Sequence, residues 1–114
     1  DLFVPDTAIH YCIEVKFYKN THFDDKVLTN KSSEFIRWWD QATDQAKKTN
    51  RKPLLFFKYN RSKVFVAVKD APQRTKKFMY VGHLGCYVMI AEEWLINEQP
   101  EFINGQNLPK VSAV

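Results

Sequence analysis

The sequence IHYCIEVKFY, residues 9–18, decides the fold class that we predict. Its β-branched and aromatic residues favour a β-strand. Side chains alternate between the two faces of a strand, so Glu14 and Lys16 project from one face while Ile13 and Val15 project from the other. We therefore expect a strand that carries a carboxylate and an ammonium group side by side.

The residues on either side of this strand indicate a hairpin and a loop. Residues 1–4 are apolar apart from Asp1 and residues 5–7 favour a turn, so an antiparallel partner strand is predicted before residue 9. Residues 20–31 are polar and show no periodicity, which indicates a loop.

A helix is predicted from Ser32 or Ser33 to about Thr49. Apolar residues recur in this segment at the spacing of one buried helical stripe. The stripe consists of Phe35, Trp38, Trp39, Ala42 and Ala46. At this spacing the two tryptophans are predicted to be core residues rather than a surface that stacks on bases. Gln41 and Gln45 lie at the edge of the stripe, on the flank of Trp38.

Short strands and a second helix are predicted after the first helix. We expect a hairpin from residues 54–59 and 63–69, a basic loop over 70–77, short strands at 78–81 and 87–90, and a helix over 91–97. This order predicts an α/β domain with a central mixed sheet flanked by helices. The domain is expected to span residues 1–98 and to precede a tail, residues 99–114, with little pattern.

The charge of the chain is unevenly distributed. Seventeen Lys and Arg residues against thirteen Asp and Glu residues give a formal net charge of +4. Between Lys47 and Lys77, Asp70 is the only acidic residue. The middle of the chain is therefore the expected surface for an anionic partner such as nucleic acid.

Cys12 and Cys86 lie in apolar stretches and lack the spacing of a metal-binding motif. Both are predicted to be buried, reduced thiols, with a disulfide between them as the alternative. No apolar stretch approaches the roughly 20 residues that span a bilayer, so we expect a cytoplasmic protein with no membrane contact. The chain opens with Asp1 directly in a strand-like segment, so we expect that an N-terminal segment is missing.

The chemistry is predicted to centre on Glu14 and Lys16. Phosphodiester hydrolysis requires a divalent cation that polarises a phosphoryl oxygen, and a positive charge that stabilises the transition state. Carboxylates and a main-chain carbonyl can hold Mg²⁺, while a neighbouring lysine supplies the charge. The alternative is that the two residues form ordinary solvated cross-strand ion pairs.

The surroundings of this pair resemble the PD-(D/E)xK nuclease superfamily. The resemblance consists of an Asp-led strand, a tight turn, a strand that ends in Ile-Glu-Val-Lys, a helix with Trp38-Trp39-Asp40-Gln41 and a strand that begins at Pro53. The helix, the following Pro-Leu-Leu and the Lys-Tyr-Asn-Arg at residues 58–61 look most like phage and bacterial Holliday-junction-resolvase-like endonucleases. The resemblance covers about residues 1–69 and implies a restriction-endonuclease-like core.

The resemblance also implies roles for individual residues. Asp1, Glu14 and the Val15 carbonyl would bind Mg²⁺, for which Mn²⁺ is a substitute. Lys16 would be the catalytic lysine, and Gln41 would be the helix glutamine that borders the site. Asp6 is an alternative to Asp1, because Pro5 and Asp6 also match the PD of the motif. We prefer Asp1, which would lie across the hairpin from Glu14.

Several basic residues are candidates for contacts with DNA phosphates. They are Lys19, Lys58, Arg61 and Lys63. The alternative for each is an ordinary solvated surface cation. His10, His22 and His83 form no ligand cluster, although His10 shares a strand face with Glu14.

Together these features predict a Mg²⁺-dependent endonuclease that hydrolyses phosphodiester bonds in branched DNA such as Holliday junctions. We expect it to act as a homodimer, because two strands must be cut symmetrically, and to work in a bacterial cytoplasm, encoded by a bacterium or a phage. Two alternatives remain at this point. One is a nucleic-acid-binding domain without catalysis, and the other is a nuclease of the same fold that cuts ordinary duplex DNA in repair or restriction.

Overall fold

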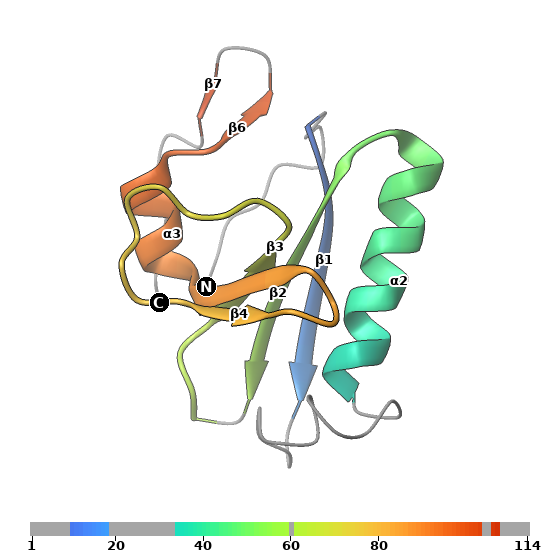
Figure 1. Ribbon diagram of the computed structural model, residues 1–114, viewed down its shortest axis with the longest axis horizontal. Helices are drawn as coiled ribbons and strands as arrows, with labels where there is room; N and C mark the ends of the chain where they lie inside the picture. The colour runs from blue at the N-terminus through green and yellow to red at the C-terminus, as the bar shows by residue number, and fades with distance from the viewer. Residues whose placement is uncertain (1–9, 19–33, 60, 104–105, 108–114) are drawn as a thin grey trace.

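The computed structural model describes residues 10–18, 34–59, 61–103 and 106–107 (Figure 1). In chain order its elements are β1 (Tyr11–Tyr18), α2 (Glu34–Thr49), β2 (Lys52–Tyr59), β3 (Phe65–Val68), β4 (Met79–Val81), β5 (Cys86–Ile90), α3 (Ala91–Glu98), β6 (Glu101–Ile103) and β7 (Gln106–Asn107). The predicted α/β class is confirmed, and each predicted strand and helix in these ranges lies close to its expected residues. The predicted strand over 1–4, the turn and the loop over 20–31 lie outside the described residues.

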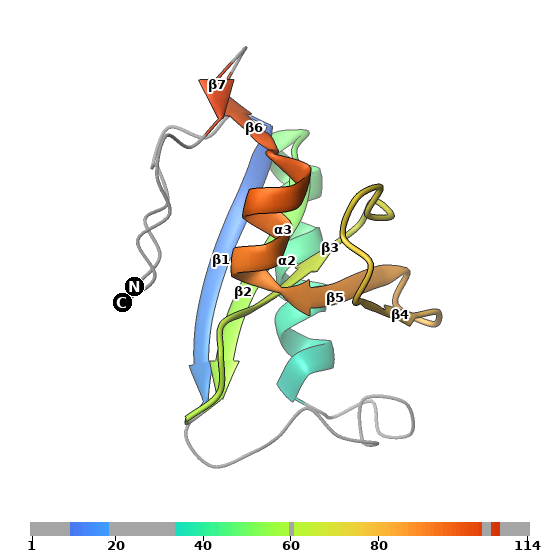
Figure 2. The same ribbon diagram turned by 90° about the vertical axis from the view of Figure 1, so that its left-hand side faces the viewer.

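Five of the strands form one mixed sheet in the order β1-β2-β3-β5-β4. β1 pairs with β2 in parallel, and every other neighbouring pair in this sheet is antiparallel. A parallel pair needs a crossover connection, which α2 supplies. Figures 1 and 2 show α2 on one face of the sheet and α3 on the other.

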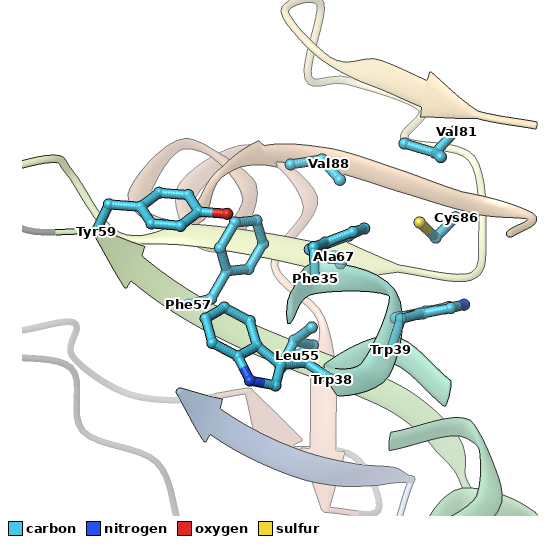
Figure 3. Close-up of a cluster of buried hydrophobic side chains, with 10 residues drawn as sticks. All are labelled: Phe35, Trp38, Trp39, Leu55, Phe57, Tyr59, Ala67, Val81, Cys86 and Val88. Atoms are coloured by element: carbon cyan, nitrogen blue, oxygen red, sulfur yellow. The ribbon is translucent and has the colours of Figure 1, made fainter. Parts of the chain in front are cut away.

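The core has two layers because β2 is buried on both of its faces. Leu54, Leu55 and Phe56 are 0% exposed and Phe57 is 1% exposed. Leu55 and Phe57 pack in the cluster under α2, which Figure 3 shows, whereas Leu54 and Phe56 pack in the cluster under α3. A short strand of continuous apolar sequence is typical of such a fully covered position.

The α2 layer confirms the role predicted for the two tryptophans. Trp38 and Trp39 are 8% and 3% exposed, and both belong to the core cluster under the helix. The Trp39 indole N–H donates a hydrogen bond to the Leu84 carbonyl at 3.1 Å, which satisfies its polar atom where the ring is buried. Neither ring is therefore available to stack on a base.

In the C-terminal half of β1, the described residues cover only one of the two faces. On the face of α3, Tyr11 and Ile13 pack against the core, but Val15 and Phe17 are 65% and 58% exposed. The short helix α3 ends the cover before it reaches the second half of β1. Val15 and Phe17 therefore bury little apolar surface against the other described residues.

The cysteines are free, as predicted, but only one is fully buried. Cys86 lies in the core, and burial raises the pKa of its thiol to about 12. Cys12 is partly exposed, because it lies on the edge strand β1. The prediction that both thiols are buried was therefore correct for Cys86 and wrong for Cys12.

The segment after α3 contains a second, separate sheet that the sequence pattern did not reveal. β6 pairs with β7 in an antiparallel arrangement.

No described helix is both long and apolar enough to cross a membrane.

Replacing Phe57 by alanine should lower the free energy of unfolding by about 3–5 kcal/mol, because removal of a buried ring leaves a cavity. Phe57 contacts the rings of Phe35, Trp38, Tyr59 and Phe65. Phe17→Ala, at an exposed position on the neighbouring strand, is the matched control and should change stability by less than about 0.5 kcal/mol. Urea denaturation measures both values, and equal losses at the two positions would contradict the layered core.

Candidate active site

Glu14 and Lys16 lie on the face of the sheet that α2 covers. In the parallel register Glu14 is opposite Leu55 and Lys16 is opposite Phe57. Register partners point to the same side of a sheet, and both partners belong to the cluster under α2. The two charged side chains are partly exposed, because β1 is an edge strand. They therefore stand where the hydrophobic core meets solvent.

Neither Glu14 nor Lys16 forms an ion pair with another described residue. The ion pairs there join Arg37 to Glu34, and Lys52 to Asp70. The alternative of a cross-strand ion pair is not realised by any described neighbour, since β2 presents apolar side chains opposite both residues. Among the described residues, neither charge is neutralised by an ion pair.

The main-chain carbonyl of Val15 points away from β2. The Lys52 N–H donates a hydrogen bond to the His10 carbonyl at 3.0 Å. This bond shows which residues of β1 direct their main-chain groups toward β2. Along β1, residues of even number then bond to β2, and residues of odd number direct their N–H and C=O groups to the outer edge. No described strand pairs with that edge. The carbonyl expected to bind a metal is thus on the side of β1 that faces away from β2.

Gln41 lies on the same flank of α2 as Trp38. The opposite flank is marked by Trp39, which reaches the turn before β5 through its bond to Leu84. Trp38 packs at 6.3 Å from the ring of Phe57, the register partner of Lys16. Gln41 follows by three residues, about 4.5 Å along the helix axis.

That displacement brings Gln41 to the level of Glu14. α2 runs antiparallel to β1 (Figure 1), so successive helix residues move from Lys16 toward Glu14. Two residues of β1 span about 6.6 Å, a length similar to the helical step. Gln41 is exposed, and its predicted place at the border of a site on β1 stays a prediction.

The residues present fit part of a magnesium site. Mg²⁺ prefers oxygen ligands, and the Glu14 carboxylate and Val15 carbonyl provide two kinds of them on one edge. Among the described residues no group of three or more His, Cys, Asp and Glu side chains gathers as a metal centre. Asp1 and Asp6, the two candidates for the remaining carboxylate, lie outside the described residues.

His10 does not join this site. It lies four residues before Glu14, about 13 Å along the strand. There it lines a polar cavity of about 500 Å³ with Tyr11, Asn50, Arg51, Lys52 and Glu101. Its Nε2 atom is buried without a hydrogen-bond partner.

The predicted DNA contacts are dispersed around one end of the sheet. β1 and β2 end side by side because they are parallel (Figure 1). Arg61 and Lys63 are exposed in the turn that follows β2. Lys58 is the register partner of Phe17 and therefore projects from the face opposite to Lys16. Lys19 lies outside the described residues.

The turn that carries Arg61 is locally fixed. Arg61 adopts a left-handed backbone conformation with φ of 66°. The Ser62 hydroxyl oxygen accepts a hydrogen bond from the Tyr59 N–H at 3.0 Å, and the Ser62 N–H donates to the Tyr59 carbonyl at 3.0 Å. These bonds hold the turn directly after a buried strand residue, so the position of Arg61 is set by the fold.

Glu98 is a structural residue that the sequence analysis did not identify. Its carboxylate accepts hydrogen bonds of 2.6–2.9 Å from the N–H groups of Gln73, Arg74 and Thr75 and from the Thr75 hydroxyl. It thereby fixes the middle of the basic loop to the last turn of α3. A carboxylate at a helix C-terminus is opposed by the helix dipole, and this unusual position was the available signal.

These contacts also change the acidity of Glu98. Partial burial favours the protonated form, but the hydrogen bonds from Gln73, Thr75 and Arg74 favour the carboxylate and lower its pKa from the ordinary glutamate value. At the start of the same loop, the hydrogen bond to Asp70, at 2.7 Å, raises the pKa of Lys52. Burial raises the pKa of the Tyr11 hydroxyl beside them.

A mixed five-stranded sheet with a helix on each face, and Glu-x-Lys on the edge strand that leads into the crossover helix, define a restriction-endonuclease-like core. Residues 1–94 match the protein family described as "Phage putative PDDEXK endonuclease". The chain belongs to this family. DNA is therefore the partner that its family implies.

A curated relative is similar over most of the chain. The chain is 28% identical over 87 residues to "Protein D14" of Escherichia phage T5, a match that covers 74% of this chain and 54% of that protein. The chain thus spans about half the length of this relative. No solved structure matches the chain.

Replacing Glu98 by glutamine should release the loop and lower stability by about 1–3 kcal/mol at neutral pH, since bonds to a charged acceptor are lost. A lowered pKa in the folded state means that this stability is present above the ordinary glutamate pKa of about 4.3. It is lost as the pH falls through the lower folded value. The difference between the wild type and the variant should therefore shrink in that acidic window.

Amide hydrogen exchange at Gln73, Arg74 and Thr75 locates the effect, because these three N–H groups bond to Glu98. Glu92→Gln, an exposed position in the first turn of the same helix, is the control and should leave their protection unchanged. Unaltered protection in Glu98→Gln would show that the carboxylate does not hold the loop.

Proposed function

We propose that the chain is the catalytic core of a Mg²⁺-dependent endonuclease that hydrolyses phosphodiester bonds in DNA. The observation that carries the proposal is the geometry of β1. Glu14 and Lys16 share the face under α2, and the Val15 carbonyl between them points away from β2. Carboxylate, carbonyl and ammonium groups thus converge on one short segment of an edge strand. Membership of the PDDEXK endonuclease family supports this chemistry.

Each residue has a distinct role in the proposal. Glu14 and the Val15 carbonyl would hold Mg²⁺, or Mn²⁺ in its place, together with Asp1 or alternatively Asp6. A cation held there would supply Lewis-acid chemistry and a more acidic water molecule. Lys16 places a positive charge beside the phosphoryl oxygens, where negative charge develops during hydrolysis.

The core beside Lys16 strengthens its effect. Phe57 lies opposite Lys16 and is 1% exposed, with Trp38 packed against its ring. Apolar walls lower the local dielectric constant, so a charge interacts more strongly with phosphate there than in bulk water. Gln41, exposed on the neighbouring helix flank, donates or accepts hydrogen bonds that orient a water molecule or a phosphate oxygen.

We propose branched DNA, such as a Holliday junction, as the substrate and a homodimer as the active form. Both proposals rest on the resemblance of the Trp-Trp-x-Gln helix and the Lys-Tyr-Asn-Arg turn to junction resolvases. The chain spans about half of its phage relative, so the surfaces that select a DNA shape can include residues beyond it. A nuclease that cuts ordinary duplex DNA and a binding domain without catalysis are the alternatives that experiments must separate.

Lys16→Ala should reduce the rate of Mg²⁺-dependent cleavage by about 10²–10³-fold in the complete protein, because a charge that stabilises the transition state is removed. Glu14→Ala should reduce cleavage at least as strongly, through loss of metal. Arg37→Ala is the matched control, since Arg37 is an exposed cation of α2 that is paired with Glu34. Cleavage of a labelled oligonucleotide with Mg²⁺ or with EDTA measures these effects.

The two alternatives give different results in the same assay. A binding domain retains DNA affinity in both variants and shows no cleavage with any metal. Equal activity of the wild type and Lys16→Ala would remove Lys16 from the mechanism. Binding of Mn²⁺, followed by electron paramagnetic resonance, should be weakened by Glu14→Ala but not by Lys16→Ala.

A four-way junction should be cleaved with a kcat/KM at least about tenfold higher than a linear duplex with the same arm sequences. The physical reason is that a dimer can contact two arms of a junction at a fixed angle. Sedimentation of the complete protein tests the dimer. Equal rates on both DNAs would favour the duplex nuclease.

A further inference from the structure

A second surface lies at the opposite edge of the sheet from the candidate active site. β4 and β5 bring three aromatic rings together there. The Tyr80 and Tyr87 ring centroids are 4.7 Å apart with 35° between the ring planes, and Phe78 meets Tyr87 edge-on at 5.7 Å. We name Phe78, Tyr80 and Tyr87 the aromatic platform.

The aromatic platform is exposed to solvent at an edge of the sheet, where apolar side chains are unfavourable. Phe78 and Tyr80 are 43% and 57% exposed, and Met79 between them is 50% exposed. β4 is the last strand of the sheet, and proteins usually protect such edges with charged residues or cover. A contiguous group of exposed rings with a polar surround is typical of a binding surface.

The platform is continuous with the most basic segment of the molecule. Lys76 and Lys77 directly precede Phe78, and Lys69 and Arg74 stand earlier in the same loop. All four are exposed. None of them belongs to an ion pair within the described part of the chain. The loop leads into β4 at the edge far from β1 (Figure 2), whereas Asp70 at its start is paired with Lys52 of β2.

The nearby carboxylates do not neutralise this charge. Asp70 is paired with Lys52 at 2.7 Å. Glu98 is directed to the backbone N–H groups of Gln73, Arg74 and Thr75. The same contacts tie the loop to α3 and β2, which reduces the cost of ordering it on binding.

The platform is separate from the candidate active site. Four strand spacings of about 4.8 Å place β4 about 19 Å from β1 across the sheet. The faces also differ, because Cys86 and Val88 point into the cluster under α2. Tyr87, which lies between them, packs against the cluster under α3. A residue of the platform can therefore be changed without contact with Glu14 or Lys16.

We infer that this surface binds an unpaired DNA strand, with bases stacked on the aromatic platform and phosphates paired with the cations of the loop. Aromatic rings stack on any base, but only where the base is not already stacked inside a duplex. Neighbouring lysines match the phosphates that flank a splayed base. This inference rests on the proposed function in one respect, since it names the form of DNA that the nuclease holds.

The test compares binding of a fluorescent single-stranded oligonucleotide and of its duplex in EDTA, so that cleavage does not contribute. Tyr80→Ala and Phe78→Ala should each weaken single-strand binding by about 5- to 150-fold and should change duplex binding far less. Ile96→Ala is the matched control, because Ile96 is an exposed apolar residue, 58% exposed, on α3. Circular dichroism verifies that each variant is folded.

The lysine pair is tested separately by its salt dependence. Lys76→Gln combined with Lys77→Gln should reduce the slope of log affinity against log salt by about 1.4 for single-stranded DNA, the value for two phosphate contacts. Arg37→Gln removes an exposed cation of α2 that is already paired with Glu34 and should leave the slope unchanged. An equal loss of slope for each charge removed at the two places would mean that general charge, not this loop, binds DNA.

The inference is overturned if binding of single-stranded DNA does not depend on the aromatic rings of the platform. If Tyr80→Ala binds single strands as the wild type does, or weakens single strands and duplex equally, the platform does not stack on unpaired bases. Tyr80→Leu, which keeps an apolar side chain, should also lose affinity, and full retention would point to a protein partner instead. Cleavage that depends on Lys16 but not on Tyr80 would leave the nuclease standing without this surface. Single-strand binding that depends on Tyr80, without any cleavage, would support this surface and contradict the proposed nuclease.

Discussion

The parallel pairing of β1 with β2 is the constraint on which the rest of the structure depends. Parallel neighbours cannot be joined by a tight turn, so the chain must cross the sheet, and α2 is the helix that makes this crossing. The helix brings Trp38 and Trp39 onto one face and thereby buries Leu55 and Phe57. Once this layer is formed, the register assigns Glu14 and Lys16 to the same face.

The edge position of β1 then explains how a charged pair can stand beside a hydrophobic core. A central strand such as β2 is covered on both faces and has neighbours on both sides. Ionised groups there would lose their hydration without compensation. On β1 the same groups keep contact with solvent, and the outer carbonyls of the strand remain directed away from β2. Reaction with a bulky polymer requires this access.

Local patterns in the sequence were sufficient for the elements but not for their partners. The alternation around Glu14, the helical stripe of Phe35 and Trp38, and the continuous apolar run after Pro53 each reflect burial that a single element carries by itself. These features were therefore predictable from spacing alone. The core role of the two tryptophans followed from the same spacing.

Features that join distant residues could not be found in this way. The bonds from the loop to Glu98 span 23–25 positions and depend on how α3 packs against the sheet. The orientation of Lys58, away from Lys16, follows only from the register between β1 and β2. The partial exposure of Cys12 depends on the strand order, which places β1 at the edge. The choice between Asp1 and Asp6 likewise depends on pairing, and both lie outside the described residues.

Two edges of one sheet with different chemistry suit a nuclease that selects DNA by shape. The phosphodiester bond is the same in every DNA, so Lys16 and the oxygen ligands beside it cannot by themselves distinguish one DNA form from another. In the proposed mechanism, charges at that site act on the transition state and contribute to rate. Contacts with the aromatic platform, about 19 Å away across the strands, would be the same in the ground state and the transition state. They would contribute affinity for a particular DNA form and leave the chemical step unchanged. If the proposed nuclease selects structured DNA, surfaces remote from Glu14 are therefore the expected source of that selectivity.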